Sequence, residues 1–259
     1  MNQEEIISTV KRDYLVDLAE EEKRIDEREM DEYREIEIEK DWAGNAEGSA
    51  FVKLGKTQVL TGVKIESGTP YPDKPEEGVL MTNAELAPMA HASFEAGPPG
   101  EKATELARVV DRGMRESEMI GLDQLCVEPE EEVWMVHVDI HVLDHDGNLI
   151  DASTLSSVAA LLSTEPPEDE EDWELSEFPV SKKPITTTFA KIGDALVADP
   201  CLEEENVMDA RFTMTTLEDE SICAMQKGSS GPLTKEDFKK AREWAKVKSK
   251  ELRKELERD

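Results

Sequence analysis

Three arginines at helical spacing are the residues of this sequence best suited to bind an anion. They are Arg108, Arg112 and Arg115, at positions i, i+4 and i+7. At about 100° per residue, this spacing places all three side chains within an arc of roughly 60° on a helix. A guanidinium stays charged at physiological pH, and its planar fork matches the geometry of phosphate. The sequence therefore predicts an anion site, for which the phosphates of an RNA or DNA backbone are the obvious ligand.

The same arginines could instead be neutralised by acidic residues of their own helix. Three pairs have the i,i+3 or i,i+4 spacing that brings opposite charges together. These pairs are Glu105–Arg108, Asp111–Arg115 and Arg112–Glu116. Each pair would stabilise the helix by only about 0.2–0.5 kcal/mol. Spacing alone therefore leaves open both a phosphate-binding face and a solvated, salt-bridged one.

The overall composition makes a basic cluster unusual in this chain. Its 259 residues carry a formal charge of −31, and such a field repels phosphate, so we do not expect the chain alone to bind nucleic acid non-specifically. No apolar run reaches the ~20 residues that cross a bilayer, and the N-terminus lacks the basic and apolar regions of a signal peptide. The three cysteines form no Cys-x-x-Cys pair. We therefore expect a cytoplasmic protein, without a membrane partner, whose thiols are buried and reduced.

The first part of the sequence predicts the elements that position the arginines. A helix over 101–119 would bury the face opposite the arginines, which carries Ala103, Ala107, Val110 and Met114. A further helix is predicted over 3–22, with Tyr14 and Leu18 on its apolar face. Several strands are expected between these two helices and after the second. They cover 46–55 and 57–66, joined by a hairpin at Gly55-Lys56, then 79–86 and, most clearly, 133–143.

The second part predicts a similar mixture of strands and helices. A small, apolar helix over 152–163 would be capped by Asp151. A long final helix over 234–257 begins with a capping-box pattern at Thr234 and Asp237. Four short strands are expected between them, at 185–191, 195–198, 207–214 and 221–226. The sequence thus predicts an α+β fold of two βα halves, with an N-terminal helix and a long C-terminal helix. The predicted segments are 1–30 (helical), 31–164 (first half), 165–184 (acidic linker) and 185–259 (second half with the C-terminal helix).

Two other groups of residues could in principle hold a metal ion. His137, Asp139 and His141 share one face of the 133–143 strand, but such a face is more often the solvated side of a half-buried strand. Residues 144–148 begin like a calcium loop but lack the rest of its 12-residue pattern, so a turn is expected there. We therefore predict no metal site.

A group of carboxylates follows the strand at 195–198. It consists of Asp199, Glu203, Glu205 and Asp209. Paired carboxylates can hold Mg²⁺ or transfer protons, but a chain with 61 acidic residues forms such groups by chance. The sequence has no Walker motif, no Rossmann glycine fingerprint and no Gly-x-Ser-x-Gly elbow, so no cofactor is expected.

Motifs spread over nearly the whole chain resemble one known family. The densest is Glu105-Leu-Ala-Arg-Val-Val-Asp-Arg-Gly113, continuing to Ser117. Others lie within 23–28, 46–60, 77–86, 94–99 and 143–153. In order and spacing, these motifs resemble the RNase PH-like ring subunits of the archaeal exosome, specifically the non-catalytic members. The resemblance implies an RNase PH-like fold, of the type of ribosomal protein S5 domain 2.

The resemblance also implies partners and an activity for the assembly. Three heterodimers with a catalytic RNase PH-like subunit would form a hexameric ring, RNA-binding cap subunits would cover one face, and RNA would be degraded from its 3′ end with phosphate. Arg108, Arg112 and Arg115 would then reach toward the partner's active site and bind the RNA backbone. One departure is Glu27, where the family usually has glycine.

Two departures from the catalytic pattern predict that this chain is not itself an enzyme. Catalytic relatives carry Asp-[Gly/Ala]-Gly-[Thr/Ser]-Arg, where this chain has Asp151-Ala-Ser153-Thr-Leu155. Leucine cannot neutralise phosphate, and serine restricts the close backbone approach that glycine permits. Catalytic relatives also carry Asp-x-Asp, which here is Asp199-Pro-Cys201. We therefore predict no catalytic residue. The alternatives are an active phosphorolytic exoribonuclease that uses Asp199 and Asp209, and a purely structural spacer of the ring.

Overall fold

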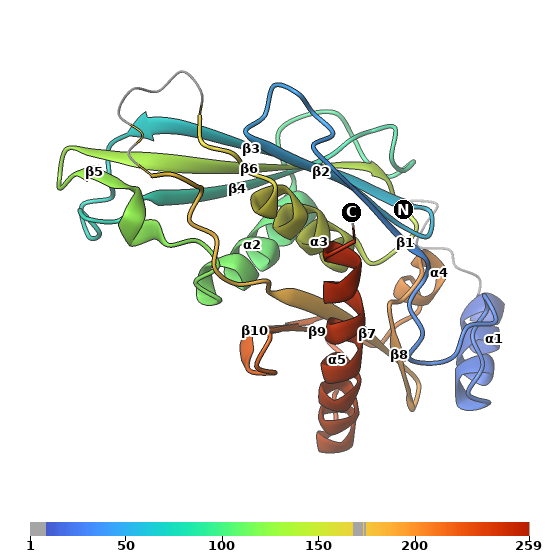
Figure 1. Ribbon diagram of the computed structural model, residues 1–259. Helices are drawn as coiled ribbons and strands as arrows, with labels where there is room; N and C mark the ends of the chain where they lie inside the picture. Colours follow the sequence, from blue (N-terminus) through green and yellow to red (C-terminus); the bar gives the residue numbers. More distant parts are fainter. Residues whose placement is uncertain (1–8, 168–172, 174, 259) are drawn as a thin grey trace.

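The chain folds into alternating layers of sheet and helix. A computed structural model describes residues 9–167, 173 and 175–258. A six-stranded sheet, a layer with two helices, a four-stranded sheet and the C-terminal helix stack in that order (Figure 1). The predicted α+β class is confirmed. Within the described residues, no helix combines the length and the apolar character needed to cross a membrane.

The first sheet is built entirely by the first part of the chain. Its order is β1-β2-β3-β6-β4, with β5 paired to β6. The strands are β1 (Ile36–Lys40), β2 (Gly48–Leu54), β3 (Thr57–Gly68), β4 (Val79–Leu86), β5 (Cys126–Glu128) and β6 (Glu132–Asp144). The β2–β3 hairpin turns at Gly55, which has a φ of +59°, as the hairpin signal predicts. Strand β4 runs parallel to β6 at the edge of the sheet and packs on α2.

Two helices fill the layer between the sheets. In α2 (Glu101–Glu116), all four residues of the predicted apolar face are buried. Helix α3 (Leu149–Leu162) is buried on every side from Ile150 to Leu161, because it packs against the first sheet and against β7 of the second. A helix enclosed in this way needs small or apolar residues all round, which explains its composition.

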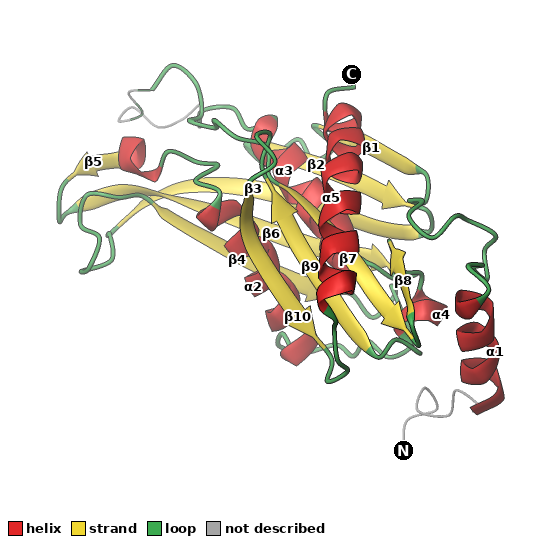
Figure 2. Ribbon diagram, turned by 90° about the horizontal axis from the view of Figure 1, so that it is seen from below, coloured by secondary structure: helices red, strands yellow, loops and turns green. Residues whose placement is uncertain are grey.

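The second sheet lies beneath these helices and is covered on its far face by the last helix (Figure 2). Its order is β10-β9-β7-β8. The strands are β7 (Ile185–Ile192), β8 (Ala195–Ala198), β9 (Ala210–Thr216) and β10 (Ile222–Gly228). Helix α5 (Lys235–Leu256) has the predicted capping box: the Asp237 amide donates to Thr234 Oγ1 at 3.1 Å, and the Thr234 amide donates to Asp237 Oδ2 at 2.9 Å. The short α4 (Leu202–Glu205) and a 3₁₀ turn at Leu122–Leu125 were not predicted from the sequence.

The N-terminal helix differs from its prediction. Helix α1 is described over Thr9–Glu20, and residues 3–8 of the predicted helix lie outside the described residues. Tyr14 was expected on the apolar face but is 55% exposed. Leu15 and Ala19 are buried instead, because α1 docks through them onto β7 and β8.

The thiols were predicted to be buried and reduced. All three are free, but only Cys201 is buried, while Cys126 and Cys223 are partly exposed.

A buried arginine ties the segment after α1 to the second half. Arg24 is 4% exposed, and its Nε and Nη2 donate to the two carboxylate oxygens of Glu204 at 2.8 and 2.6 Å. The same guanidinium also donates to the carbonyl oxygens of Ala198 and Asp199. Because these four bonds join residue 24 to residues 198–204, this one side chain holds two distant segments together.

We expect Arg24→Met to lower the free energy of unfolding by about 3–5 kcal/mol, because Glu204 would remain buried without its cation. Urea unfolding followed by tryptophan fluorescence would measure the loss. The double variant Arg24→Met/Glu204→Leu removes both charges and should recover a large part of it. A double variant no more stable than Arg24→Met would contradict the role assigned to the ion pair.

Candidate nucleic-acid interface

Helix α2 presents its three arginines on the side opposite the core. Arg108, Arg112 and Arg115 are all exposed, and we call them the arginine ridge. A cleft of about 600 Å³ lies between α2 and β10, and its lining includes Arg108, Arg112 and Gln226. A second cleft, of about 470 Å³, lies between α2 and β4, and all three arginines line it. The fold therefore brings the three predicted site residues together beside two open clefts.

The three arginines differ in their partners. Arg115 donates to both carboxylate oxygens of Asp111, at 2.9 and 3.0 Å, and to the Leu80 carbonyl at 2.9 Å. The hydrogen bonds from Arg115 to Asp111 raise the pKa of Arg115. Arg112 Nη1 donates to the side-chain oxygen of Gln226 at 2.9 Å. The Arg108 side chain makes no hydrogen bond or ion pair with any described residue.

Only one of the three local ion pairs that the spacing allows is formed among the described residues. It is Asp111–Arg115. Glu105 pairs instead with Arg211 of β9, at 2.5 Å. Arg211 and Gln226 were not predicted from the sequence, because each lies more than 100 residues from its partner and no local pattern connects them. The salt-bridged interpretation of the helix face therefore holds for Arg115 alone.

The carboxylates after β8 do not form a common site. Glu203 pairs with Lys11 at 2.6 Å, and Asp209 pairs with Arg12 at 2.7 Å. Both partners come from α1, which the sequence pattern does not connect with this region. Within the described part of the chain, no three His, Cys, Asp or Glu side chains are grouped so that they could hold a metal ion.

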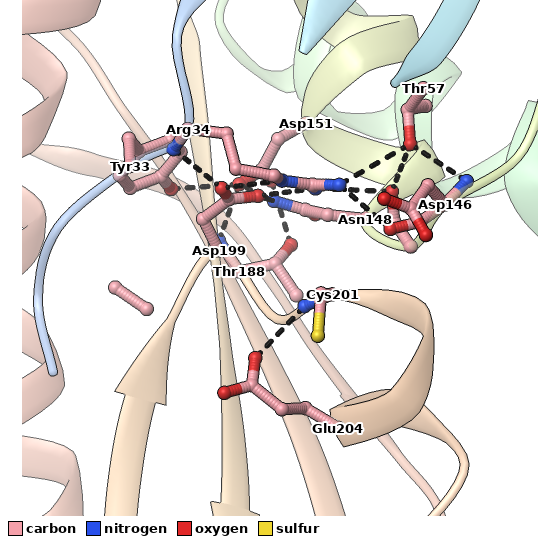
Figure 3. Close-up of polar contacts among 12 residues, drawn as sticks. Tyr33, Arg34, Thr57, Asp146, Asn148, Asp151, Thr188, Asp199, Cys201 and Glu204 are labelled. Atoms are coloured by element: carbon pink, nitrogen blue, oxygen red, sulfur yellow. Dashed lines mark hydrogen bonds and ion pairs between the residues drawn. The ribbon is translucent and has the colours of Figure 1, made fainter. Parts of the chain in front are cut away.

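The first of these carboxylates, Asp199, is enclosed by cations, and Figure 3 shows Arg34 and Asn148 beside it. It is fully buried and has a φ of +46°, in the left-handed region that residues other than glycine rarely adopt. Its oxygens accept bonds from Arg28 at 2.8 Å, from the Arg34 guanidinium at 2.7 and 2.9 Å, and from Asn148 Nδ2 at 2.7 Å. Burial alone would raise the pKa of Asp199, but the hydrogen bonds and charge of Arg34, with the charge of Arg28, lower it.

Asp151 lies beside this cluster, and its carboxylate is likewise saturated by hydrogen bonds. It was predicted to cap α3, but the residue at the cap is Asn148, and Asp151 is fully buried in the first turn. Its carboxylate accepts bonds from Tyr33 at 2.7 Å, from Asn148 at 2.8 Å, and from the Thr188 amide and hydroxyl at 2.9 and 2.7 Å. Burial raises the pKa of Asp151 to about 6 in spite of these bonds. The carboxylate therefore joins the segment before β1, α3 and β7.

The face of β6 that carries His137, Asp139 and His141 is its solvated side, as expected for a half-buried strand. His137 Nε2 lies 2.9 Å from a Glu66 carboxylate oxygen, and His141 Nδ1 lies 3.3 Å from one of Glu85. Asp139 accepts a bond from Asn83 at 3.1 Å. These are pairs between neighbouring strands, not a convergent set of ligands.

Glu205 should make the stability of the protein depend on pH. Burial raises its pKa from 4.5 to about 7, against the hydrogen bond from the Asn148 amide. The folded state therefore holds a proton that the unfolded state releases at lower pH. The stabilising contribution of this proton on Glu205 is complete below pH 4.5 and is lost as the pH rises through 7. Glu205→Gln, which keeps the acceptor oxygen, should stabilise the protein at pH 8 by roughly 1–3 kcal/mol and change little at pH 4.

Thermal unfolding of both proteins between pH 4 and pH 9 would measure this difference. Glu95→Gln, in an exposed loop, is the matched control and should leave the pH profile unchanged. Profiles of Glu205→Gln and wild type that run parallel over the whole range would show that folding does not shift the pKa of Glu205.

Comparison with known proteins places this architecture in one family. Residues 32–167 match the model of the 3′ exoribonuclease family, domain 1, and residues 183–248 match domain 2. The exosome complex component Rrp42 of Thermoplasma acidophilum is 51% identical over 249 residues, which cover 96% of each chain. The component of the same name from Methanothermobacter thermautotrophicus is 49% identical, over 93% of this chain and 92% of its own.

Solved structures agree with the sequence matches. A chain of the Archaeoglobus fulgidus exosome with RNA bound to the active site superposes with a TM-score of 0.91 at 45% identity, covering 95% of this chain and 98% of that chain. A chain of an archaeal exosome core gives 0.90 at 42% identity, covering 99% of this chain and 100% of that chain. The resemblance predicted from the motifs, and the RNase PH-like fold it implied, are confirmed. The chain therefore belongs to the 3′ exoribonuclease family of RNase PH-like proteins.

Proposed function

We propose that this chain is a non-catalytic ring component of an archaeal RNA exosome. It pairs with a catalytic RNase PH-like subunit, completes that subunit's active site by packing against it, and binds RNA during phosphate-dependent 3′-to-5′ degradation. Three such heterodimers form the ring, and RNA-binding cap subunits cover it. The names of the relatives and the RNA-bound exosome structure support this proposal.

The arginine ridge is the observation that carries the proposal. A chain of net charge −31 would repel RNA in general, yet here guanidiniums stand exposed beside two clefts. Guanidinium forks bind phosphate oxygens in pairs and need no particular base. Such a surface suits a strand of any sequence that moves along it as its end is shortened. The spacer alternative requires the arginines to be neutralised by their neighbours, and Arg108 has no such partner among the described residues.

The buried carboxylates argue against catalysis by this chain. A general acid must reach the substrate, but Asp151 and Asp199 are both 0% exposed and fully hydrogen-bonded within the fold. Leu155, where catalytic relatives carry arginine, is also 0% exposed, inside α3. Asp209, the remaining candidate acid, is paired with Arg12 of α1. These residues stabilise the structure, which leaves the chemistry to the partner.

Phosphate-dependent shortening of a labelled RNA should therefore require the partner chain. We expect no shortening by this chain alone and strong shortening by the assembled complex, measured on denaturing gels with and without phosphate. The partner alone is the reference from which the contribution of this chain is read. Phosphate-dependent activity of the isolated chain would contradict the non-catalytic role.

Charge reversal at the ridge should weaken RNA binding without disturbing assembly. In the complex, Arg112→Glu should lower the affinity for single-stranded RNA several-fold at moderate salt and reduce the salt dependence by about one phosphate contact. Fluorescence anisotropy measures the affinity, and mass measurement of the assembly checks the ring. Lys56→Glu, in the exposed β2–β3 turn, makes the same change in net charge and is the control. Equal affinities for Arg112→Glu and Lys56→Glu would remove the ridge from the RNA path.

A further inference from the structure

We propose that the β9–β10 hairpin prepares the arginine ridge for RNA through two side chains, Arg211 and Gln226. Arg211 removes an acidic competitor from Arg108, and Gln226 holds Arg112 without neutralising it. The ligand is then a backbone phosphate of single-stranded RNA in the cleft between α2 and β10. This inference rests on the proposed function and names two positioning residues that the ridge itself does not contain.

An acidic residue of α2, Glu105, could compete with an external anion for Arg108. Glu105 lies three residues before Arg108 on α2, where an ion pair would form readily. Its carboxylate instead accepts a bond from Arg211 Nη2 at 2.5 Å. Arg211 is well placed for this, because its side chain is only 19% exposed and is therefore less free to leave than a surface cation. Glu105 is thereby neutralised by β9, and Arg108 keeps its full charge for an external anion.

A glycine in β10 makes room for this arrangement. Gly228 is the register partner of Arg211, and a Cβ added at Gly228 would lie 3.0–3.2 Å from three atoms of the Arg211 guanidinium group. That separation is tighter than ordinary van der Waals contact. The Arg211 side chain therefore crosses β10 over Gly228, which has no side chain, and so reaches Glu105.

Arg112 is oriented by a neutral partner. Its Nη1 donates to the Gln226 side-chain oxygen at 2.9 Å, which fixes the guanidinium over the cleft. An amide oxygen is a neutral acceptor, so the arginine keeps its charge. Its other side-chain N–H donors bond to none of the described residues and can bind phosphate. A carboxylate at position 226 would satisfy the same bond but would cancel the charge. The neutral partner is therefore the one that orients Arg112 without competing with RNA.

Arg115 has a different role. Its three hydrogen bonds connect α2 with the edge strand β4, through Asp111 and the Leu80 carbonyl, and Asp111 neutralises its charge. Arg115 is also absent from the lining of the α2–β10 cleft, whereas Arg108 and Arg112 both line it. In the α2–β10 cleft, the phosphate-binding pair is therefore Arg108 and Arg112, and Arg115 braces the helix that carries them.

The test measures RNA affinity of the assembled complex over a series of salt concentrations, with a fluorescent oligoadenylate as probe. Arg211→Gln should weaken binding about 3- to 10-fold and lower the salt dependence by about one contact, because Glu105 turns to Arg108. Adding Glu105→Gln should restore near wild-type binding, because the released competitor is gone. Gln226→Glu should weaken binding like Arg211→Gln. Lys56→Gln, in the exposed β2–β3 turn, removes one cation outside the ridge and should leave binding and its salt dependence unchanged.

Each outcome bears on the inference. If Arg211→Gln/Glu105→Gln remains as weak as Arg211→Gln alone, Arg211 acts otherwise than by neutralising Glu105, and the inference is overturned. A loss of binding in Lys56→Gln as large as that in Arg211→Gln would show a general effect of net charge and would likewise overturn the inference. If Arg108→Gln and Arg112→Gln weaken binding while the hairpin variants do not, the proposed function stands and only the role of the hairpin is lost. If neither Arg108→Gln nor Arg112→Gln changes binding, the proposed function and the role of the hairpin both fail.

Discussion

The arrangement of the chain depends on the ion pairs and hydrogen bonds of one buried carboxylate, that of Asp199. Its two oxygens gather Arg28 and Arg34 from the N-terminal segment and Asn148 from the cap of α3. An ionised carboxylate at zero exposure would be very costly without these cations, so the segments that carry them are held in place. Arg24 adds a second buried tie through Glu204, and Asp151 continues the network through Tyr33 and Thr188.

This network separates two uses of charge in one fold. At the start of α3, charged groups are buried, paired and saturated, and they hold the two sheets around the central helices. On α2, charged groups are exposed and only partly paired, and they face open clefts. Free energy of association with an anion can come only from the second kind, because a saturated pair gains nothing from a further ligand. The same contrast explains how a strongly acidic chain can still expose cations beside open clefts.

Several features of the fold followed from local patterns. Alternation predicted β6, the Gly55 turn predicted the β2–β3 hairpin, and the capping box predicted the start of α5. The apolar face of α2 was also correct, because helical periodicity alone decides which residues of a helix share a side. The predictions of buried and capping residues failed where packing against other elements decides the position of a side chain. Tyr14 of α1 is exposed, and Asp151 joins three segments instead of capping α3.

By itself, the sequence determined the family, the order of the elements and the position of three arginines on one helix face. Each of these rests on residues close together in the chain or on motifs in a fixed order. Only the tertiary structure decided which arginines keep their charge free, because Arg211 and Gln226 reach α2 from strands more than 100 residues away. It likewise decided that Asp199 is enclosed, since its cations come from the other end of the chain. Spacing reports neighbours on a helix, whereas the partner of a charged side chain is set by how the elements pack.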